Sequence, residues 1–176
     1  MRGLELLAVR LWAAALAVFV AFSAAACAAE EAPLRTTLAR KWERRALQRA
    51  LSGAIRRLER PRCQRIFSDF KLPAGRVLQE ELDALGQTGP SFLRDWIFFA
   101  DGREEPRCAD PRVLAMTQPG SRSVWICGRQ FSREHRQAPG ETEVILIHET
   151  LHALGLGEDP PSSAAISRQV VARCGS

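Results

Sequence analysis

Residues 141–159, ETEVILIHETLHALGLGED, carry most of the information on the fold of this chain. Acidic residues at the start of the stretch suit the positive end of a helix dipole. The run at 144–147 is entirely apolar, which predicts a helix that is buried on most of its circumference. Gly155 can adopt the left-handed conformation that commonly ends a helix. The stretch therefore predicts a buried helix that begins at Glu141 and ends at Gly155.

Two histidines follow the apolar run, one helical turn apart. His148 and His152 lie on the same helix face, and two imidazoles placed in this way can bind one Zn²⁺. Glu149 can reach a water molecule bound to that metal, as in an HExxH site. The alternative is a structural histidine pair with Glu149 as a surface charge, but a buried helix tolerates unpartnered His and Glu poorly. We therefore expect His148 and His152 to bind Zn²⁺ and Glu149 to be catalytic.

A catalytic zinc ion usually has three protein ligands. After His152 the chain offers only Glu158, Asp159 and Cys174. We expect Glu158 to be the third ligand, with Asp159 as the alternative. His135, in the segment before the helix, is a further candidate.

The pattern His148-Glu149-x-x-His152-x-x-Gly155-x-x-Glu158 resembles the metzincin zinc-binding sequence HExxHxxGxxH, with Glu in place of the third His. Snapalysin-like enzymes, which are related secreted zincins, use an acidic third ligand at that place. The resemblance implies a zincin-type zinc metallopeptidase. It also implies that His148, His152 and Glu158 bind zinc and that Glu149 polarises the attacking water.

The chain departs from the metzincin pattern in two ways. Metzincins have a Met-turn after the motif, whereas both methionines here, Met1 and Met116, precede it. Several metzincins also use a Tyr to stabilise the oxyanion, and this chain has no Tyr. We therefore expect a minimal zincin without a Met-turn, and the group that stabilises the oxyanion stays open between His135 and an arginine such as Arg168.

The function that these residues predict is peptide-bond hydrolysis by a zinc-bound water, with Glu149 as the general base. The expected substrate is a peptide or protein, held as an added strand by residues 113–117 or 124–127. The alternative is a non-catalytic exported module that binds zinc or associates with the cell envelope. Structural zinc sites usually have four protein ligands, and a fourth is not evident in the sequence.

The N-terminal segment 1–28 is typical of a secretory signal peptide. Arg2 precedes the apolar run 11–22, which small residues follow. Cys27 stands where a lipoprotein carries its acylated cysteine, although the third residue before it is Ala rather than the usual Leu. Lipidation, ordinary cleavage and a retained membrane anchor are the alternatives. We expect an exported protein that is secreted, periplasmic or anchored to the envelope through Cys27, with a single domain at 29–176.

The other four cysteines are expected to form two disulfides, because an even number in an exported chain is typical of a disulfide framework. Two strand-like stretches joined by a Pro-Gly turn separate Cys108 from Cys127. Pairing of these strands brings the two cysteines together, which leaves Cys63 to pair with Cys174. A four-cysteine zinc site is less consistent with the sequence, which has no CxxC pair.

A hydrophobic fraction of 46% over 176 residues excludes a wholly disordered chain and favours a single domain. The predicted class is α+β, with a short antiparallel sheet or hairpin beside the motif helix. The further elements expected are a long amphipathic helix at 34–60, a short helix near 77–85, a buried strand or core segment at 96–99, a loop at 129–140 and a C-terminal helix at 163–173.

Positive charge is concentrated in the long helix. Residues 35–65 contain eleven Lys and Arg against two Glu, whereas residues 66–176 contain 12 basic and 15 acidic side chains. The basic helix at 35–60 is therefore a candidate for binding an anionic membrane or envelope surface. A solvated face is the alternative. Export argues against nucleic acid as a partner, and the sequence leaves the oligomeric state open.

Overall fold

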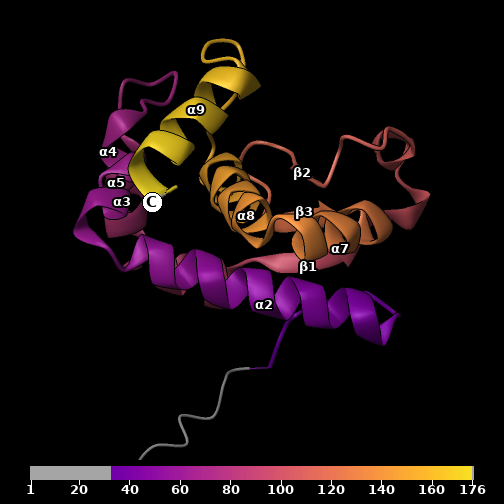
Figure 1. Cartoon of the computed structure of the whole chain (residues 1–176). Helices are drawn as coiled ribbons and strands as arrows, with labels where there is room; N and C mark the ends of the chain where they lie inside the picture. The colour runs from indigo at the N-terminus through magenta and orange to yellow at the C-terminus, as the bar shows by residue number, and fades with distance from the viewer. Residues whose placement is uncertain (1–32, 176) are drawn as a thin grey trace, which may run out of the picture. The chain divides into compact units, whose positions relative to one another are not determined.

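A computed structural model describes residues 33–175, and the compact unit that it defines is Leu34–Ser176 (Figure 1). The unit has an α+β fold, as predicted, with helices packed around a small three-stranded sheet. The predicted signal peptide at 1–28, including Cys27, lies outside the described residues. The elements are α2 (Lys41–Leu58), α3 (Pro61–Gln64), α4 (Ile66–Asp69), α5 (Leu78–Ala84), α6 (Gly89–Ser91), the π-helical turn η1 (Phe92–Trp96), β1 (Phe98–Asp101), the 3-10 turns η2 (Gly102–Glu104) and η3 (Pro106–Ala109), β2 (Ala115–Thr117), β3 (Ser123–Ile126), α7 (Gly128–Gln137), α8 (Pro139–Ala153) and α9 (Ser163–Cys174).

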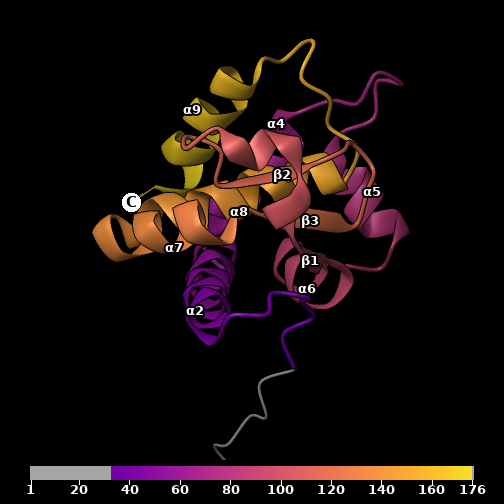
Figure 2. The ribbon, with the colours of Figure 1, turned by 90° about the vertical axis from the view of Figure 1, so that its right-hand side faces the viewer.

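The motif helix, α8, is the centre of the fold. It packs against α2 and α9 on opposite sides, and against α7, β2 and β3 (Figures 1 and 2). Its apolar residues Leu146, Ile147 and Leu151 are fully buried, which confirms the buried helix. The helix begins at Pro139, before the predicted Glu141, because proline suits the first turn of a helix.

The long helix α2 begins at Lys41, so the prediction of a helix from residue 34 was wrong. The preceding residues pair with strand β1 instead. The N–H of Thr37 donates to the carbonyl of Phe99, and the N–H of Phe99 donates to the carbonyl of Arg35. These hydrogen bonds hold the segment extended. Trp42 is one of the apolar residues that make the predicted helix amphipathic, but it is 43% exposed.

The sheet has the strand order β1-β3-β2. Strands β2 and β3 form the predicted antiparallel hairpin, with Met116 opposite Trp125. The third strand, β1, pairs with β3 in parallel, so the sheet is mixed rather than purely antiparallel. This order leaves β2 at the edge of the sheet, on the side that packs against α8.

The segment at 129–140 was predicted to be a loop, and this prediction was wrong. Residues 128–137 form the helix α7. Its buried side contains Phe131, Ser132 and His135, so only one large apolar residue marks it. A segment with one large apolar residue among ten is so polar overall that its sequence resembles a loop.

The C-terminal helix α9 follows the prediction closely. Ser162 caps it by accepting a hydrogen bond from the N–H of Ala165. Both predicted disulfides are present, Cys63–Cys174 and Cys108–Cys127.

The buried apolar core and both disulfides lie within the compact unit Leu34–Ser176. Two disulfides are compatible with an extracellular protein. Within residues 33–175, none of the helices combines the length and the apolar character required to cross a bilayer.

Candidate metal centre

The three predicted ligands come together at the C-terminal end of α8. The Nε2 atoms of His148 and His152 lie 2.9 Å apart, and Oε1 of Glu158 lies 3.3 Å from Nε2 of His152. All three ligand atoms lie within 4.8 Å of one another. The two imidazoles are buried, whereas the side chain of Glu158 is 47% exposed. The cluster therefore has a buried side and a side open to solvent.

The turn after α8 brings Glu158 back to the histidines. Gly155 has a φ of 107°, a conformation that side chains other than glycine's rarely adopt. The carbonyl of Leu156 then lies 2.6 Å from Nδ1 of His152. Because a carbonyl only accepts, Nδ1 carries a proton, and Nε2 is the ring nitrogen that faces His148 and Glu158.

His148 is held from the opposite side by the C-terminal helix. Its Nδ1 lies 3.1 Å from the hydroxyl of Ser167 on α9. Burial, and to a smaller extent the neighbouring His152, lower the pKa of His148 to about 4, against the opposing effect of Glu158. The ring is therefore neutral at pH 7, which is the form that binds a metal.

Glu149 points its carboxyl group into a polar pocket beside the cluster. The residue is 5% exposed, and its Oε2 has no hydrogen-bond partner within the described residues. Burial is the main reason why the pKa of Glu149 is raised to about 8; Thr117 and Arg107 act to lower it and Glu158 to raise it. A carboxyl group in this environment becomes a carboxylate at neutral pH once a positive charge is placed nearby.

The pocket has a volume of about 290 Å³ and runs along the edge strand β2. Met116 and Thr117 line one wall, and the motif residues of α8 line the other. Arg107, an exposed residue of η3, also lines it. The disulfide of the adjacent Cys108 links this turn to Cys127, immediately before α7. An extended chain could therefore lie between β2 and the cluster.

The donor set fits a zinc ion. Imidazole nitrogen and carboxylate oxygen are common zinc ligands, and ligand atoms about 2.0–2.1 Å from a tetrahedral zinc lie roughly 3.3 Å apart. The distances of 2.9 Å between His148 and His152 and 3.3 Å between His152 and Glu158 are close to this spacing. The unpartnered oxygen of Glu149 is not one of these three donors and is available to accept a hydrogen bond from a water molecule.

Other candidates from the sequence do not join the cluster. Asp159 is exposed and does not line the pocket. His135 is buried on α7, with its Nδ1 2.8 Å from the hydroxyl of Thr142. Arg168 is exposed on α9 and is not a lining residue. Cys174 is in a disulfide and cannot be a thiolate ligand.

Sequence reasoning missed two residues of the site, Arg107 and Ser167. Helical spacing could have found Ser167, because Ser163 and Ser167 are one turn apart on α9 and both line the pocket. Arg107 reaches the pocket only through the folding of η3, for which the sequence has no local signal.

No family model, curated protein or solved structure matches this chain. The chemistry of the cluster, rather than relatedness, is therefore the basis for assigning a function.

Proposed function

We propose that the protein is an exported, zincin-type zinc metallopeptidase in which Glu149 is the general base. The observation that carries this proposal is a buried carboxyl group with an unpartnered oxygen, next to a two-histidine and one-carboxylate ligand set in an open pocket. Hydrolysis of an amide bond needs these parts: a base, a site for an electrophilic metal and room for the substrate.

The ligands of the zinc ion are His148, His152 and Glu158. Zinc, when bound, polarises a carbonyl group and lowers the pKa of water to about 7. A structural zinc site takes four protein ligands, whereas the candidate group within the described residues has three. This number favours an enzyme over the alternative, a non-catalytic module with a structural zinc.

Glu149 removes a proton from the attacking water and later gives it to the leaving nitrogen. Its unpartnered Oε2 is available to the water, because no residue of the described chain occupies that oxygen. Arg107 is the lining cation whose charge acts on Glu149, while Arg112 is paired with Asp110. Arg107 is therefore the residue we assign to stabilising negative charge that develops on the substrate.

The substrate is a peptide or protein segment in an extended conformation. Strand β2 pairs with β3 on one side only, so its other edge can pair with an added strand. Because Met116 and Thr117 line the pocket, a segment paired with β2 would pass beside the ligand cluster.

The substitution Glu149→Gln tests the assignment. Glutamine has nearly the same shape but cannot act as a base, so we expect zinc binding to persist and hydrolysis to fall roughly 10²–10⁴-fold. A set of fluorogenic peptides assayed with the zinc-loaded protein measures this. The control Glu158→Gln should reduce both zinc content and hydrolysis. Hydrolysis by Glu149→Gln at the wild-type rate would remove Glu149 from the mechanism.

A further inference from the structure

Exposed cations lie on two helices that pack against each other, α2 and α7 (Figures 1 and 2). None of these side chains forms an ion pair with another described residue. We call them the basic surface, and its members are Lys41, Arg45, Arg49 and Arg56 on α2 and Arg129, Arg133 and Arg136 on α7.

The two halves of the basic surface adjoin each other. Arg49 of α2 interacts electrostatically with His135 of α7, and Arg129 of α7 does so with Glu43 of α2. Arg49 therefore lies near α7 and Arg129 lies near α2, so the cations of the two helices occupy neighbouring parts of the surface. Unpaired cations gathered in this way create a local positive potential that attracts an anionic partner.

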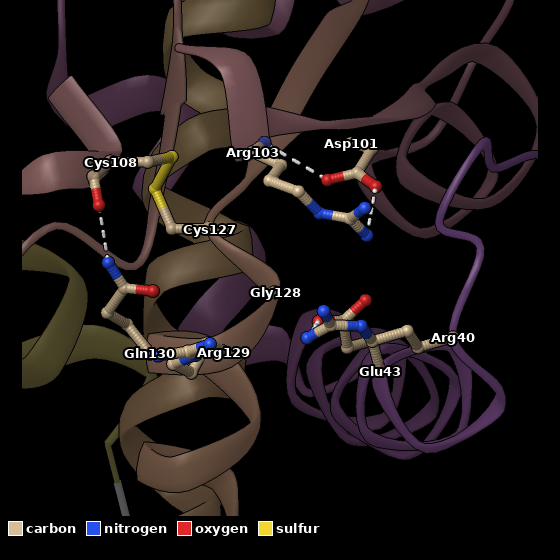
Figure 3. Close-up of a pocket in the computed structure, with 9 residues that line it drawn as sticks. All are labelled: Arg40, Glu43, Asp101, Arg103, Cys108, Cys127, Gly128, Arg129 and Gln130. Carbon is tan, nitrogen blue, oxygen red and sulfur yellow. Dashed lines mark hydrogen bonds and ion pairs between the residues drawn. A yellow bond between two sulfur atoms is a disulfide. The ribbon is translucent and has the colours of Figure 1, made fainter. Parts of the chain in front are cut away.

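A pocket of about 220 Å³ lies where both helices begin (Figure 3). Arg40 is the N-cap of α2 and Gly128 is the first residue of α7, and neither helix has a capping side chain. Arg40, Arg103 and Arg129 line the pocket. Arg40 lies 3.7 Å from Oε1 of Glu43 and Arg103 pairs with Asp101, so Arg129 is the lining arginine without an ion pair in the described part of the chain. Its guanidinium and the positive ends of the two helix dipoles favour a bound anion.

The pocket also contains two carboxyl groups, Glu43 and Asp101. Asp101 is occupied, because it pairs with Arg103. Glu43 is 3% exposed, and its Oε2 has no hydrogen-bond partner within the described residues. A carboxyl oxygen buried in that position needs a hydrogen-bond partner. The ligand that satisfies the whole pocket therefore carries an anionic group together with hydroxyl donors.

Trp42 adds an apolar contact at the same end of α2. Its ring is 43% exposed, and the guanidinium of Arg40 lies 5.8 Å from the ring centroid. Tryptophan beside cations is favoured at the boundary between water and lipid, where its ring is apolar and its N–H is polar.

We propose that the basic surface docks on a bilayer containing anionic phospholipid, with a phosphatidylglycerol headgroup in the pocket at Arg40 and Glu43. The phosphate of this headgroup matches the guanidinium groups, and its glycerol hydroxyls match Glu43. A free phosphate ion would bind in the pocket without contacting the cations along both helices or the ring of Trp42. A lipid surface contacts the pocket, the cations and the ring.

Docking on this face is compatible with the metal centre. None of the residues that line the pocket at Glu149 belongs to α2 or α7. In both views α2 lies across the fold from α9, which contributes Ser163 and Ser167 to that pocket (Figures 1 and 2). The protein can therefore be bound to a membrane while the pocket stays open.

Sedimentation with vesicles tests the proposal, using oxidised protein of residues 29–176. We expect binding to phosphatidylcholine vesicles that contain phosphatidylglycerol, and little binding to phosphatidylcholine alone. Raising the salt concentration should weaken the binding, because screening shortens the range of the attraction. Each cation near such a surface contributes about fivefold in affinity.

Charge-reversal variants locate the surface. The triple variant Arg45→Glu, Arg49→Glu and Arg56→Glu should bind at least roughly 100-fold more weakly, because loss of the three cations alone costs about fivefold each, and so should the equivalent α7 variant at 129, 133 and 136. The matched control reverses Arg65, Lys71 and Arg168, three exposed cations on other elements, and should lose far less affinity. Circular dichroism of each variant shows that it is folded.

Two further variants test the pocket and the ring. Glu43→Gln should reduce the preference for phosphatidylglycerol over phosphatidic acid, whose headgroup has no glycerol. Trp42→Ala should weaken binding to both lipids. An equal loss of affinity in the control variant and in the two variants of the basic surface would overturn the proposal. So would equal binding to neutral vesicles, or binding to soluble polyglutamate without binding to phosphatidylglycerol vesicles.

Discussion

Nε2 of His148 lies 2.9 Å from Nε2 of His152, and each ring is held at its other nitrogen by a group from a different part of the chain. The carbonyl of Leu156 holds His152, and the hydroxyl of Ser167 contacts His148. A metal-binding histidine commonly has such a partner, which fixes the ring and its tautomer. The two rings are therefore oriented for a shared ligand before any metal binds.

The contact between Ser167 and His148 predicts the effect of Ser167→Ala on metal affinity. Loss of the hydroxyl leaves the ring of His148 free to turn, so we expect zinc to bind about tenfold more weakly. Competition with a chromogenic chelator measures this. Ser163→Ala is the matched control, because Ser163 lines the same pocket without contacting either histidine. Equal effects of the two substitutions would show that the contact with His148 does not orient the ring.

The ligand set was predictable because local sequence determines most of its geometry. Residues four apart on a helix must lie together, and Gly155 signals the turn that returns Glu158 to them. The hairpin and the Cys108–Cys127 disulfide were predicted from two strand-like stretches joined by a Pro-Gly turn. The Cys63–Cys174 disulfide was then predicted as the remaining pair.

The features that sequence did not predict depend on contacts between distant segments. Residues 35–37 are extended because they pair with Phe99, and α7 has only Phe131 as a large apolar anchor. Arg107 enters the pocket through the fold of η3. None of these contacts has a periodic signal that could be read from the local sequence.

The surroundings of Gly53 on α2 predict that its replacement by alanine destabilises the protein, the opposite of the usual effect in a helix. In an exposed helix, Gly→Ala stabilises by about 1 kcal/mol. Here a Cβ would clash with the carboxylate of Glu143, which is paired with Arg57 at 2.6 Å. We expect Gly53→Ala to destabilise the protein by about 1–3 kcal/mol in urea unfolding.

The same substitution in a Glu143→Ala background should be stabilising, because the clash is gone and the helix propensity of alanine remains. A loss of stability from Gly53→Ala in both backgrounds would show that contacts other than Glu143 exclude a side chain at this position.

The ion pair between Asp69 and Arg173 predicts a pH-dependent contribution to stability. Hydrogen bonding by Arg173 lowers the pKa of Asp69 below its usual 3.8, against the opposing effect of burial. A depressed carboxyl pKa stabilises the fold above the unfolded-state value, and this contribution is lost as pH falls through the folded-state value.

We therefore expect Asp69→Asn to cost about 1 kcal/mol at neutral pH and less near pH 2. Urea unfolding at the two pH values measures the difference. The control is Asp83→Asn, since Asp83 is exposed and bonded only to the amide of Gln79. A cost for Asp69→Asn that is the same at both pH values would contradict the ion-pair account.

The two disulfides should differ in their effect on stability. Cys63 and Cys174 are 111 residues apart in the sequence, whereas Cys108 and Cys127 are 19 apart. In the chain-entropy model, closing the longer loop stabilises by about 5 kcal/mol and the shorter by about 3 kcal/mol. Urea unfolding of the two paired Cys→Ala variants should show the larger loss for Cys63 and Cys174. A larger loss for Cys108 and Cys127 would indicate that native contacts around this disulfide affect stability more than loop length does.

The zinc content of oxidised protein of residues 29–176 tests the central claim most directly. Elemental analysis of the wild type should find about one zinc per chain, held by His148, His152 and Glu158. Asp159→Ala should keep that zinc, and Glu158→Ala should lose it. A wild type that binds no zinc, or one whose zinc depends on Asp159 and not on Glu158, would contradict the account.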